Sequence, residues 1–343
     1  MTEERFVIHK PKDQEKEIQS FPKNVRTLAD FEGQPIEPRG WIVDGVVPEA
    51  CVMTWGGPPG AGKSLATQQL CMSVATGQNF LGIPTKTIPT LYITCEDDEN
   101  ELRRRAEAIR IHLGVTVVDL SDFHFSSWVG DPNTVLVASN KLFELKRFIE
   151  ENHIGLLVLD LIPDFWLGNE IVRSEVNAFM KGTLGTLAAQ TGCTVIGVHH
   201  PSKAGIADKS GTSGSTSWEG SVRQRIYLTG EDANGIRSLE VKKSNYGVRG
   251  EVASVKWESV GDHSGVLVAT DDIRISEPKK LGKYEQPFMD AIPEDGISRE
   301  RHRDIWTQRG IKRQEYHRAK NSLLRDSQIK EEDGVLFRLI PTQ

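Results

Sequence analysis

The most informative part of the sequence is Gly57-Pro58-Pro59-Gly60-Ala61-Gly62-Lys63-Ser64. It fits the pattern G-x-x-x-x-G-K-[ST] without a mismatch, after a short apolar stretch at residues 51–55 and before residues 65–75, which read as a helix. Glycines let the backbone wrap closely around a polyphosphate, and the following helix N-terminus adds partial positive charge. The order of strand, loop and helix therefore predicts a phosphate-binding loop rather than a glycine-rich turn that binds nothing.

Two side chains of this loop carry the expected chemistry. Lys63 is expected to bridge the outer phosphates of ATP, and the Ser64 hydroxyl to hold Mg²⁺. The other members of the loop are expected to line the nucleotide site: Gly57, Pro58, Pro59, Gly60, Ala61 and Gly62.

Length and charge limit the possible classes of protein. The 343 residues suffice for one large domain and a smaller one, and the net charge of −6 argues against a uniformly basic nucleic-acid coat. The charge is uneven, because residues 279–343 carry 14 basic and 11 acidic side chains, whereas the rest carries 28 and 37. A basic tail on an acidic body leaves room for a local nucleic-acid patch.

The cysteines and the apolar content predict a cytoplasmic protein without a membrane segment. The four cysteines are scattered through apolar stretches without paired spacing, so we expect buried thiols in a reducing compartment. Apolar runs stay well short of the roughly 18 residues of a transmembrane helix, and residues 1–5 are too polar for a signal peptide.

Acidic residues follow two further predicted strands. Residues 90–95 end at Glu96, which we assign as the general base that orients water, whereas Asp97 and Asp98 are better explained as caps of the next helix. The most apolar strand, residues 155–159, ends at Asp160, which we expect to reach the magnesium shell. Ligands collect at this edge of an open α/β sheet.

A histidine pair ends the next strand, residues 193–198. His199 and His200 could bind zinc, but no third ligand is evident nearby, and a polar sensor of the γ-phosphate fits better. Residues 201–217, rich in Gly, Ser, Thr and Lys, are expected to form a loop. This loop is either a surface excursion or a DNA contact through Lys203 and Lys209.

The chain divides into four predicted segments. Residues 1–38 form an N-terminal arm, residues 39–275 an α/β ATPase domain with a mostly parallel sheet and an antiparallel extension, and residues 276–283 a linker. Residues 284–343 read as three helices and a hairpin, which together predict a small winged-helix-like domain. Its last helix would present basic side chains to duplex DNA, among them Arg313 and Arg318, although a protein-docking cap with a solvated basic face is the alternative.

These features together resemble the RecA-like ATPases, and within them the plasmid RepA-type hexameric replicative helicases, a relative of the DnaB class. The resemblance covers about residues 40–270. It implies a twisted, mostly parallel sheet flanked by helices. It also gives Lys63, Ser64, Glu96, Asp160 and His200 the roles assigned above.

Two further stretches carry the resemblance. Residues 214–223 are similar to the family segment that delivers an arginine finger to the adjacent subunit's ATP, which makes Arg223 the expected finger, unless it forms an ordinary surface salt bridge. Arg225 is less favoured because it opens a strand. Residues 241–247 look like the family's Lys-x-Asn-Tyr-Gly motif, where Lys242 is a candidate DNA contact and Ser244 replaces the arginine of the DnaB class.

The resemblance implies a ring-forming, ATP-dependent DNA helicase of replication. The expected partners are further copies of the chain, in a hexamer with ATP between subunits, and single-stranded DNA in the channel. Duplex DNA or a replication protein would bind the C-terminal domain. Two alternatives remain, a RecA-like ATPase that does not unwind, such as a recombination mediator or loader, and a DNA-binding regulator switched by nucleotide.

Overall fold

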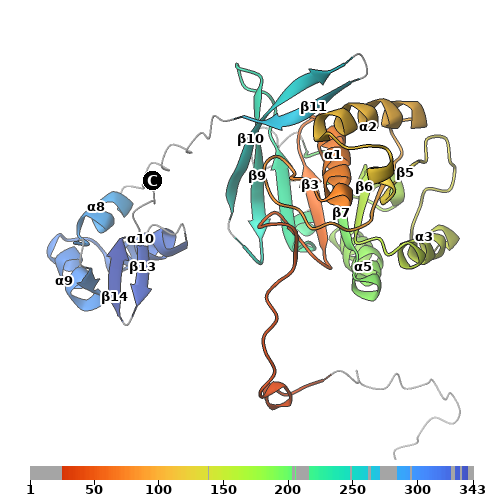
Figure 1. Cartoon of the computed structure of the whole chain (residues 1–343). Helices are drawn as coiled ribbons and strands as arrows, with labels where there is room; N and C mark the ends of the chain where they lie inside the picture. Colours follow the sequence, from red (N-terminus) through yellow and green to blue (C-terminus); the bar gives the residue numbers. More distant parts are fainter. Residues whose placement is uncertain are drawn as a thin grey trace, which may run out of the picture. The chain divides into compact units, whose positions relative to one another are not determined.

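The computed structural model describes most of the chain (Figure 1), namely residues 25–137, 139–202, 205, 216–247, 249–261, 264–270, 284–293, 296–325, 329–332 and 334–338. The described residues up to Gly40 belong to one unit, which holds a short 3-10 helix, η1 (Leu28–Phe31). The second unit begins at Trp41. The predicted linker, residues 276–283, lies outside the described residues.

Six parallel strands form the centre of a nine-stranded sheet. Their order across the sheet is β8-β3-β7-β6-β4-β5. The bounds are β3 (Val52–Gly56), β4 (Thr90–Thr94), β5 (Phe123–Ser127), β6 (Leu156–Asp160), β7 (Thr194–His199) and β8 (Gln224–Leu228). Because the strands are parallel, their carboxyl ends share one edge of the sheet, as the sequence predicts.

Three antiparallel strands extend the sheet beyond β8. They are β9 (Ile236–Ser244), β10 (Gly250–Val260) and β11 (Ser264–Ala269), paired in that order. The predicted antiparallel extension is confirmed. Strands β9 and β10 are longer than expected, because their pairing continues to Ile236 and Ser244 in β9 and to Gly250 and Val260 in β10.

Helices cover both faces of the sheet. Leu156 and Val158 of β6 belong to one core cluster, with residues of α1 (Lys63–Thr76) and α2 (Glu99–Leu113). Their neighbours Leu157 and Leu159 belong to the other, with residues of α3 (Asn140–Glu151) and α5 (Gly185–Thr191). This period of two buries both faces of the strand, as expected for a parallel sheet between helices.

Helix α1 is buried on nearly all sides, and its polar residues are paired accordingly. The Gln68 Nε2 donates to the carbonyl oxygen of Leu102 at 2.8 Å. The Gln69 amide donates to the carbonyl oxygen of Leu267 at 2.8 Å and accepts from the Leu267 N–H at 3.1 Å. Because both backbone groups of one β11 residue are bonded to α1, the hairpin formed by β10 and β11 is held against the helix that follows the phosphate loop.

Three local differences separate the structure from the sequence-based expectation. Residues 41–48, expected as a single approach to the core, form an antiparallel pair, β1 (Trp41–Val43) and β2 (Val47–Pro48). Helix α7 (Thr216–Gly220) is shorter than predicted, because Gln224 already begins β8. The helix expected over residues 173–191 is continuous but changes type: α4 (Arg173–Asn177), the π-helix η4 (Ala178–Leu184) and α5.

Two short 3-10 helices complete the ATPase region. They are η2 (Val118–Leu120), which precedes β5, and η3 (Ile162–Phe165), which follows β6. Of the cysteines, Cys51, Cys71 and Cys193 are buried and Cys95 is partly buried, and none of the four forms a disulfide. Among the described residues, none of the helices combines the length and apolarity needed to cross a membrane.

The C-terminal residues have a small core of their own. Helices α8 (Glu285–Asp290), α9 (Arg299–Gln308) and α10 (Arg313–Arg325) accompany a three-stranded antiparallel sheet. The strands are β12 (Ile297–Ser298), β13 (Ile329–Glu332) and β14 (Val335–Arg338), in the order β12-β14-β13. Phe288, Trp306 and Tyr316 pack at the centre. Ser298 caps α9 as predicted, whereas the two-residue β12 was not expected.

Candidate functional site

The phosphate loop connects β3 to α1, and its glycines are required by geometry. Gly60 and Gly62 have φ values of 75° and 91°, in the left-handed region that favours glycine. At Gly57, a Cβ atom would come within 2.5 Å of the carbonyl oxygen of Leu228. All three glycines therefore have a backbone reason to stand where the motif places them.

Lys63 is buried at the first position of α1 and points back over the loop. Its Nζ donates to the carbonyl oxygen of Pro58 at 3.1 Å and lies 3.0 Å from Nδ1 of His200. Burial lowers the pKa of Lys63 to about 8, partly opposed by the negative charges of Asp160 and Glu96. The surroundings of the ammonium group therefore disfavour its charged form on balance, and a bound phosphate would stabilise that form.

Asp160 ends β6 with its carboxylate fully buried. The Tyr92 hydroxyl donates to Oδ2 at 2.5 Å, while Oδ1 has no hydrogen-bond partner among the described residues. Burial raises the pKa of Asp160, and hydrogen bonds from Tyr92 and Ser64 oppose this rise. A buried carboxylate oxygen without a partner, next to the Ser64 hydroxyl, is a donor set that suits a hard cation such as Mg²⁺.

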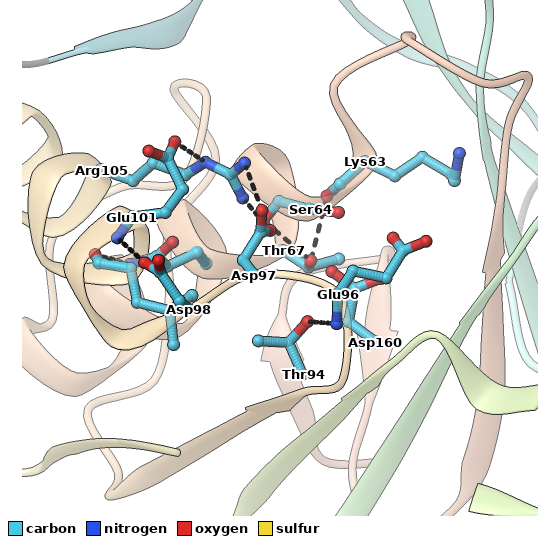
Figure 2. A network of polar contacts seen from close by, with 12 residues as sticks. Lys63, Ser64, Thr67, Thr94, Glu96, Asp97, Asp98, Glu101, Arg105 and Asp160 are labelled. Atoms are coloured by element: carbon cyan, nitrogen blue, oxygen red, sulfur yellow. Dashed lines mark hydrogen bonds and ion pairs between the residues drawn. The ribbon is translucent and has the colours of Figure 1, made fainter. Parts of the chain in front are cut away.

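Glu96 follows β4 and has an exposed carboxylate. Figure 2 shows it beside Asp160 and on the side of the loop where Lys63 lies. Within the described part of the chain, the Glu96 carboxylate has no hydrogen bond or ion pair. Desolvation, together with the charges of Asp160, Asp164 and Asp97, raises the pKa of Glu96. An accessible carboxylate of raised pKa is suited to hold and deprotonate water.

The two acids after Glu96 have structural partners (Figure 2). Asp98 caps α2, as predicted, because its Oδ1 accepts from the N–H of Glu101 at 2.8 Å. Asp97 does not cap the helix. Instead it binds Arg105 through two hydrogen bonds, at 2.6 and 3.1 Å, and Arg105 also bonds Glu101. These contacts fix the turn that presents Glu96.

The histidine pair divides into a buried and an exposed residue. His199 is buried, and desolvation lowers its pKa to about 4, so it is neutral at physiological pH. His200 is exposed next to Lys63, and burial and the Lys63 charge lower its pKa. Among the described residues, no three His, Cys, Asp or Glu side chains gather as a metal site, so zinc gains no support.

The phosphate loop, Lys63, Asp160 and Glu96 thus lie together at one edge of the sheet. A family model described as an AAA domain matches residues 15–205. The chain belongs to the AAA domain family. The matched part holds β1 through β7, the phosphate loop, Glu96, Asp160 and the histidine pair. The protein is thus a P-loop ATPase, which implies nucleotide binding, usually with Mg²⁺, and nucleotide hydrolysis. Its mixed α/β sheet, mostly parallel and flanked by helices, agrees with that class.

Arg223 lies away from the phosphate loop of its own chain. Its N–H donates to the carbonyl oxygen of Val52 at 3.2 Å, so it lies level with the start of β3. Gly57 comes five residues later along that strand, which corresponds to about 16 Å. The exposed Arg223 side chain therefore stands at the opposite edge of the sheet from the loop.

The residues around Arg223 brace its turn. Arg225 is buried and forms an ion pair with Glu219 at 2.5 Å. The Lys243 Nζ donates to the carbonyl oxygens of Glu219 and Val222, and the N–H of Asn245 donates to the carbonyl oxygen of Arg223 at 2.9 Å. Residues of the 241–247 stretch thus hold the backbone on both sides of Arg223.

The candidate DNA contacts of the ATPase region remain predictions. Lys203 and Lys209 lie outside the described residues. Lys242 is partly buried, forms an ion pair with Glu240 at 2.5 Å and lies 5.5 Å from the centre of the Tyr227 ring. A DNA phosphate at Lys242 would have to compete with Glu240.

In the C-terminal residues, Arg313 and Arg318 are exposed on α10, while Tyr316 and Ala319 of the same helix are buried. Arg318 has a partner in Glu315 at 3.4 Å. Lys320 is bound to Glu331 at 2.7 Å. The exposed face of α10 is therefore basic, but less so than the sequence alone implies.

The pocket at the phosphate loop has one wall that the sequence motif does not predict. Besides Lys63, Ser64 and Glu96, it is lined by Arg237 of β9 and Trp257 of β10. These two residues follow the loop by about 170 to 200 positions and stand in ordinary strand patterns. The packing of the antiparallel strands β9, β10 and β11 against α1 and α2 brings them to the site.

Proposed function

We propose that the protein is a Mg²⁺-dependent ATPase motor of the RepA type. It forms a ring, with ATP between subunits, and moves single-stranded DNA through its channel as a replicative helicase. The position of Arg223 carries this proposal. An arginine finger that lies about 16 Å along a strand from its own phosphate loop can act only on the nucleotide of another copy.

The residues at the loop have complementary tasks in this proposal. Lys63 and the backbone of the loop bind the β- and γ-phosphates, and Ser64 and Asp160 hold Mg²⁺, which supplies charge neutralisation when bound. Glu96 orients the attacking water and accepts its proton. His200, whose Nδ1 lies 3.0 Å from Nζ of Lys63, acts as the sensor of the γ-phosphate by donating a ring N–H to it.

The arginine completes the site from the neighbouring subunit. A guanidinium brought next to the γ-phosphate neutralises the charge that develops in the transition state, and such fingers are worth roughly 10³-fold or more in rate. Because Lys243 and Asn245 brace the Arg223 turn, the side chain projects from a fixed backbone. Hydrolysis in one subunit is thereby coupled to the position of the next.

The C-terminal residues form a winged-helix-like module in this proposal. Three helices and a three-stranded sheet support it, with α10 as the helix that enters a groove of duplex DNA through Arg313 and Arg318. The neutralisation of Lys320 by Glu331 also favours the other reading, a module that docks a replication protein.

The deciding experiment measures ATP hydrolysis with and without single-stranded DNA, with the particle mass determined by light scattering in the same samples. We expect stimulation by DNA in a ring-sized particle, strand separation on a forked substrate, and no hydrolysis in Lys63→Ala. Stimulated hydrolysis without strand separation would favour a recombination mediator or loader. Hydrolysis that ignores DNA, in a monomer or dimer, would contradict the motor. It would favour the nucleotide-switched regulator, which should lose duplex binding, but not ATPase activity, on deletion of residues 279–343.

A further inference from the structure

The nucleotide pocket has two ends with different chemistry. Glu96, Asp160 and His200 stand at the ends of β4, β6 and β7, on one side of β3 in the sheet order. They define where the γ-phosphate must lie if hydrolysis takes place. The nucleoside therefore has to leave the loop at its other end, beside whatever forms the rest of the pocket.

The rest of the pocket is built largely by the antiparallel extension. Arg237, Trp257 and Leu267, from β9, β10 and β11, line the same pocket as Gly62 and Lys63. The hairpin of β10 and β11 is held there by the bonds between Gln69 and Leu267. The helix α2 also contributes, but its cation, Arg105, is already engaged by Asp97 and Glu101.

Trp257 offers an aromatic surface at this wall. Its side chain is 50% exposed although it lines the pocket, and the indole crosses directly over Gly265 of β11. A Cβ atom at residue 265 would come within 2.2 Å of the indole ring. The glycine thus allows the ring to lie against the β11 backbone, and much of the remaining ring surface stays accessible. Indole rings stack well on flat aromatic groups.

Arg237 gives the same wall an unsatisfied polar group. Its side chain is buried, at 7% exposure, and one terminal nitrogen pairs with Glu231. The Nε and Nη1 atoms have no hydrogen-bond partner among the described residues. Buried donors without acceptors are costly, so a wall of this composition favours a ligand that carries acceptor atoms.

We propose that Trp257 stacks on the nucleobase of the nucleotide held by the phosphate loop, with Arg237 as the adjacent polar contact. This inference rests on the proposed ATPase function and deepens it, since it names the residue that recognises the nucleoside end of the ligand. Stacking tolerates different bases, so the subsite selects for an aromatic base rather than for one hydrogen-bond pattern.

The test compares a ligand with a base to one without. The dissociation constants of Mg-ATP and of inorganic tripolyphosphate are measured for the wild-type chain, Trp257→Ala, Trp257→Phe and the control Lys256→Ala, which lies on the same strand outside this pocket. We expect Trp257→Ala to weaken ATP binding by roughly 5- to 100-fold and to leave tripolyphosphate unchanged. Trp257→Phe should retain most of the affinity. Lys256→Ala should bind both ligands like the wild type.

A spectroscopic signature separates stacking from a structural effect. ATP should change the tryptophan fluorescence of the wild-type chain, and the part of this change that comes from Trp257 should disappear in Trp257→Phe. Equal losses of ATP and tripolyphosphate affinity in Trp257→Ala, or no loss of either, would overturn the proposal. The helicase proposal is tested separately. If the wild-type chain binds ATP but its hydrolysis does not respond to DNA, the helicase proposal fails, and the binding measurements still test the stacking of Trp257.

Discussion

The Lys243 ammonium group donates a hydrogen bond to the carbonyl oxygen of Val222, at 2.8 Å, directly before Arg223. A second bond, at 2.5 Å, goes to the carbonyl oxygen of Glu219 at the end of the short helix α7. One lysine therefore fixes the helix end and the turn from which Arg223 projects. Desolvation lowers the pKa of Lys243, which means that keeping the charged ammonium group at this position carries an energetic cost.

Replacement of Lys243 by methionine keeps most of the side-chain volume and removes both bonds. We expect ATP hydrolysis to fall about tenfold, because Arg223 loses its fixed backbone, while ATP affinity stays unchanged. Single-turnover hydrolysis and equilibrium ATP binding measure the two quantities. Lys256→Met serves as the control, since Lys256 is an exposed lysine of β10. Equal losses of binding and hydrolysis would show that Lys243 supports the fold rather than the finger.

Arg223 should act in trans, and mixed rings can show it. Arg223→Ala and Lys63→Ala are each expected to abolish hydrolysis, and Arg223→Ala should keep its affinity for ATP. In an equal mixture of the two variants, about a quarter of the interfaces join an intact loop to an intact arginine. Hydrolysis should therefore return to about a quarter of the wild-type rate. An inactive mixture, or an active Arg223→Ala, would exclude the finger role.

Nucleotide affinity should depend on pH through Lys63. The pKa of Lys63 is lowered to about 8, and a bound polyphosphate favours the protonated form and raises it. Above pH 8 the free protein must therefore take up a proton to bind, and affinity should fall by up to about tenfold per pH unit. Titration calorimetry from pH 7 to 9.5, in buffers of different ionisation enthalpy, measures both affinity and proton uptake. A flat affinity over this range would contradict the assignment.

Tyr92 should influence the metal through Asp160. Tyr92→Phe removes the hydrogen bond that helps to keep Asp160 ionised, so the pKa of Asp160 rises further. The concentration of Mg²⁺ that half-activates hydrolysis should increase about tenfold. The same assay on Tyr246→Phe, which alters a tyrosine of the 241–247 stretch, provides the comparison. An unchanged Mg²⁺ dependence would place the cation elsewhere.

The sequence predicts the part of the site that depends on local order. The phosphate loop and the strands before Glu96 and Asp160 can be predicted, because in each case the motif or acidic residue lies within a few residues of the apolar run that forms the strand. Parallel strands then bring those ends to one edge whatever the details of packing. The AAA domain match supports this part.

The other wall of the pocket could not be predicted in the same way. Trp257 and Arg237 come to the loop through the pairing of β9, β10 and β11 and through the packing of β11 on α1 and α2. There Gln69, a polar residue in an almost entirely buried helix, bonds the backbone of β11. That contact joins residues 198 positions apart and has no periodic signal. The ion-pair partners of Asp97 and Lys320 could not be predicted either, because the sequence does not show which opposite charge the fold brings next to a charged side chain.

The importance of the Gln69 contact can be measured as stability. In Gln69→Leu, the buried N–H and C=O of Leu267 lose their partners, which should lower the free energy of unfolding by roughly 2–5 kcal/mol. For a domain of this size we expect the midpoint of thermal unfolding to fall by about 5 °C or more. Gln78→Leu, at an exposed position beyond the end of α1, is the matched control and should change little. Because the same contact holds the Trp257 wall at the phosphate loop, Gln69→Leu should also weaken ATP binding more than tripolyphosphate binding. A destabilised variant that binds both ligands normally would show that β11 reaches the loop without Gln69.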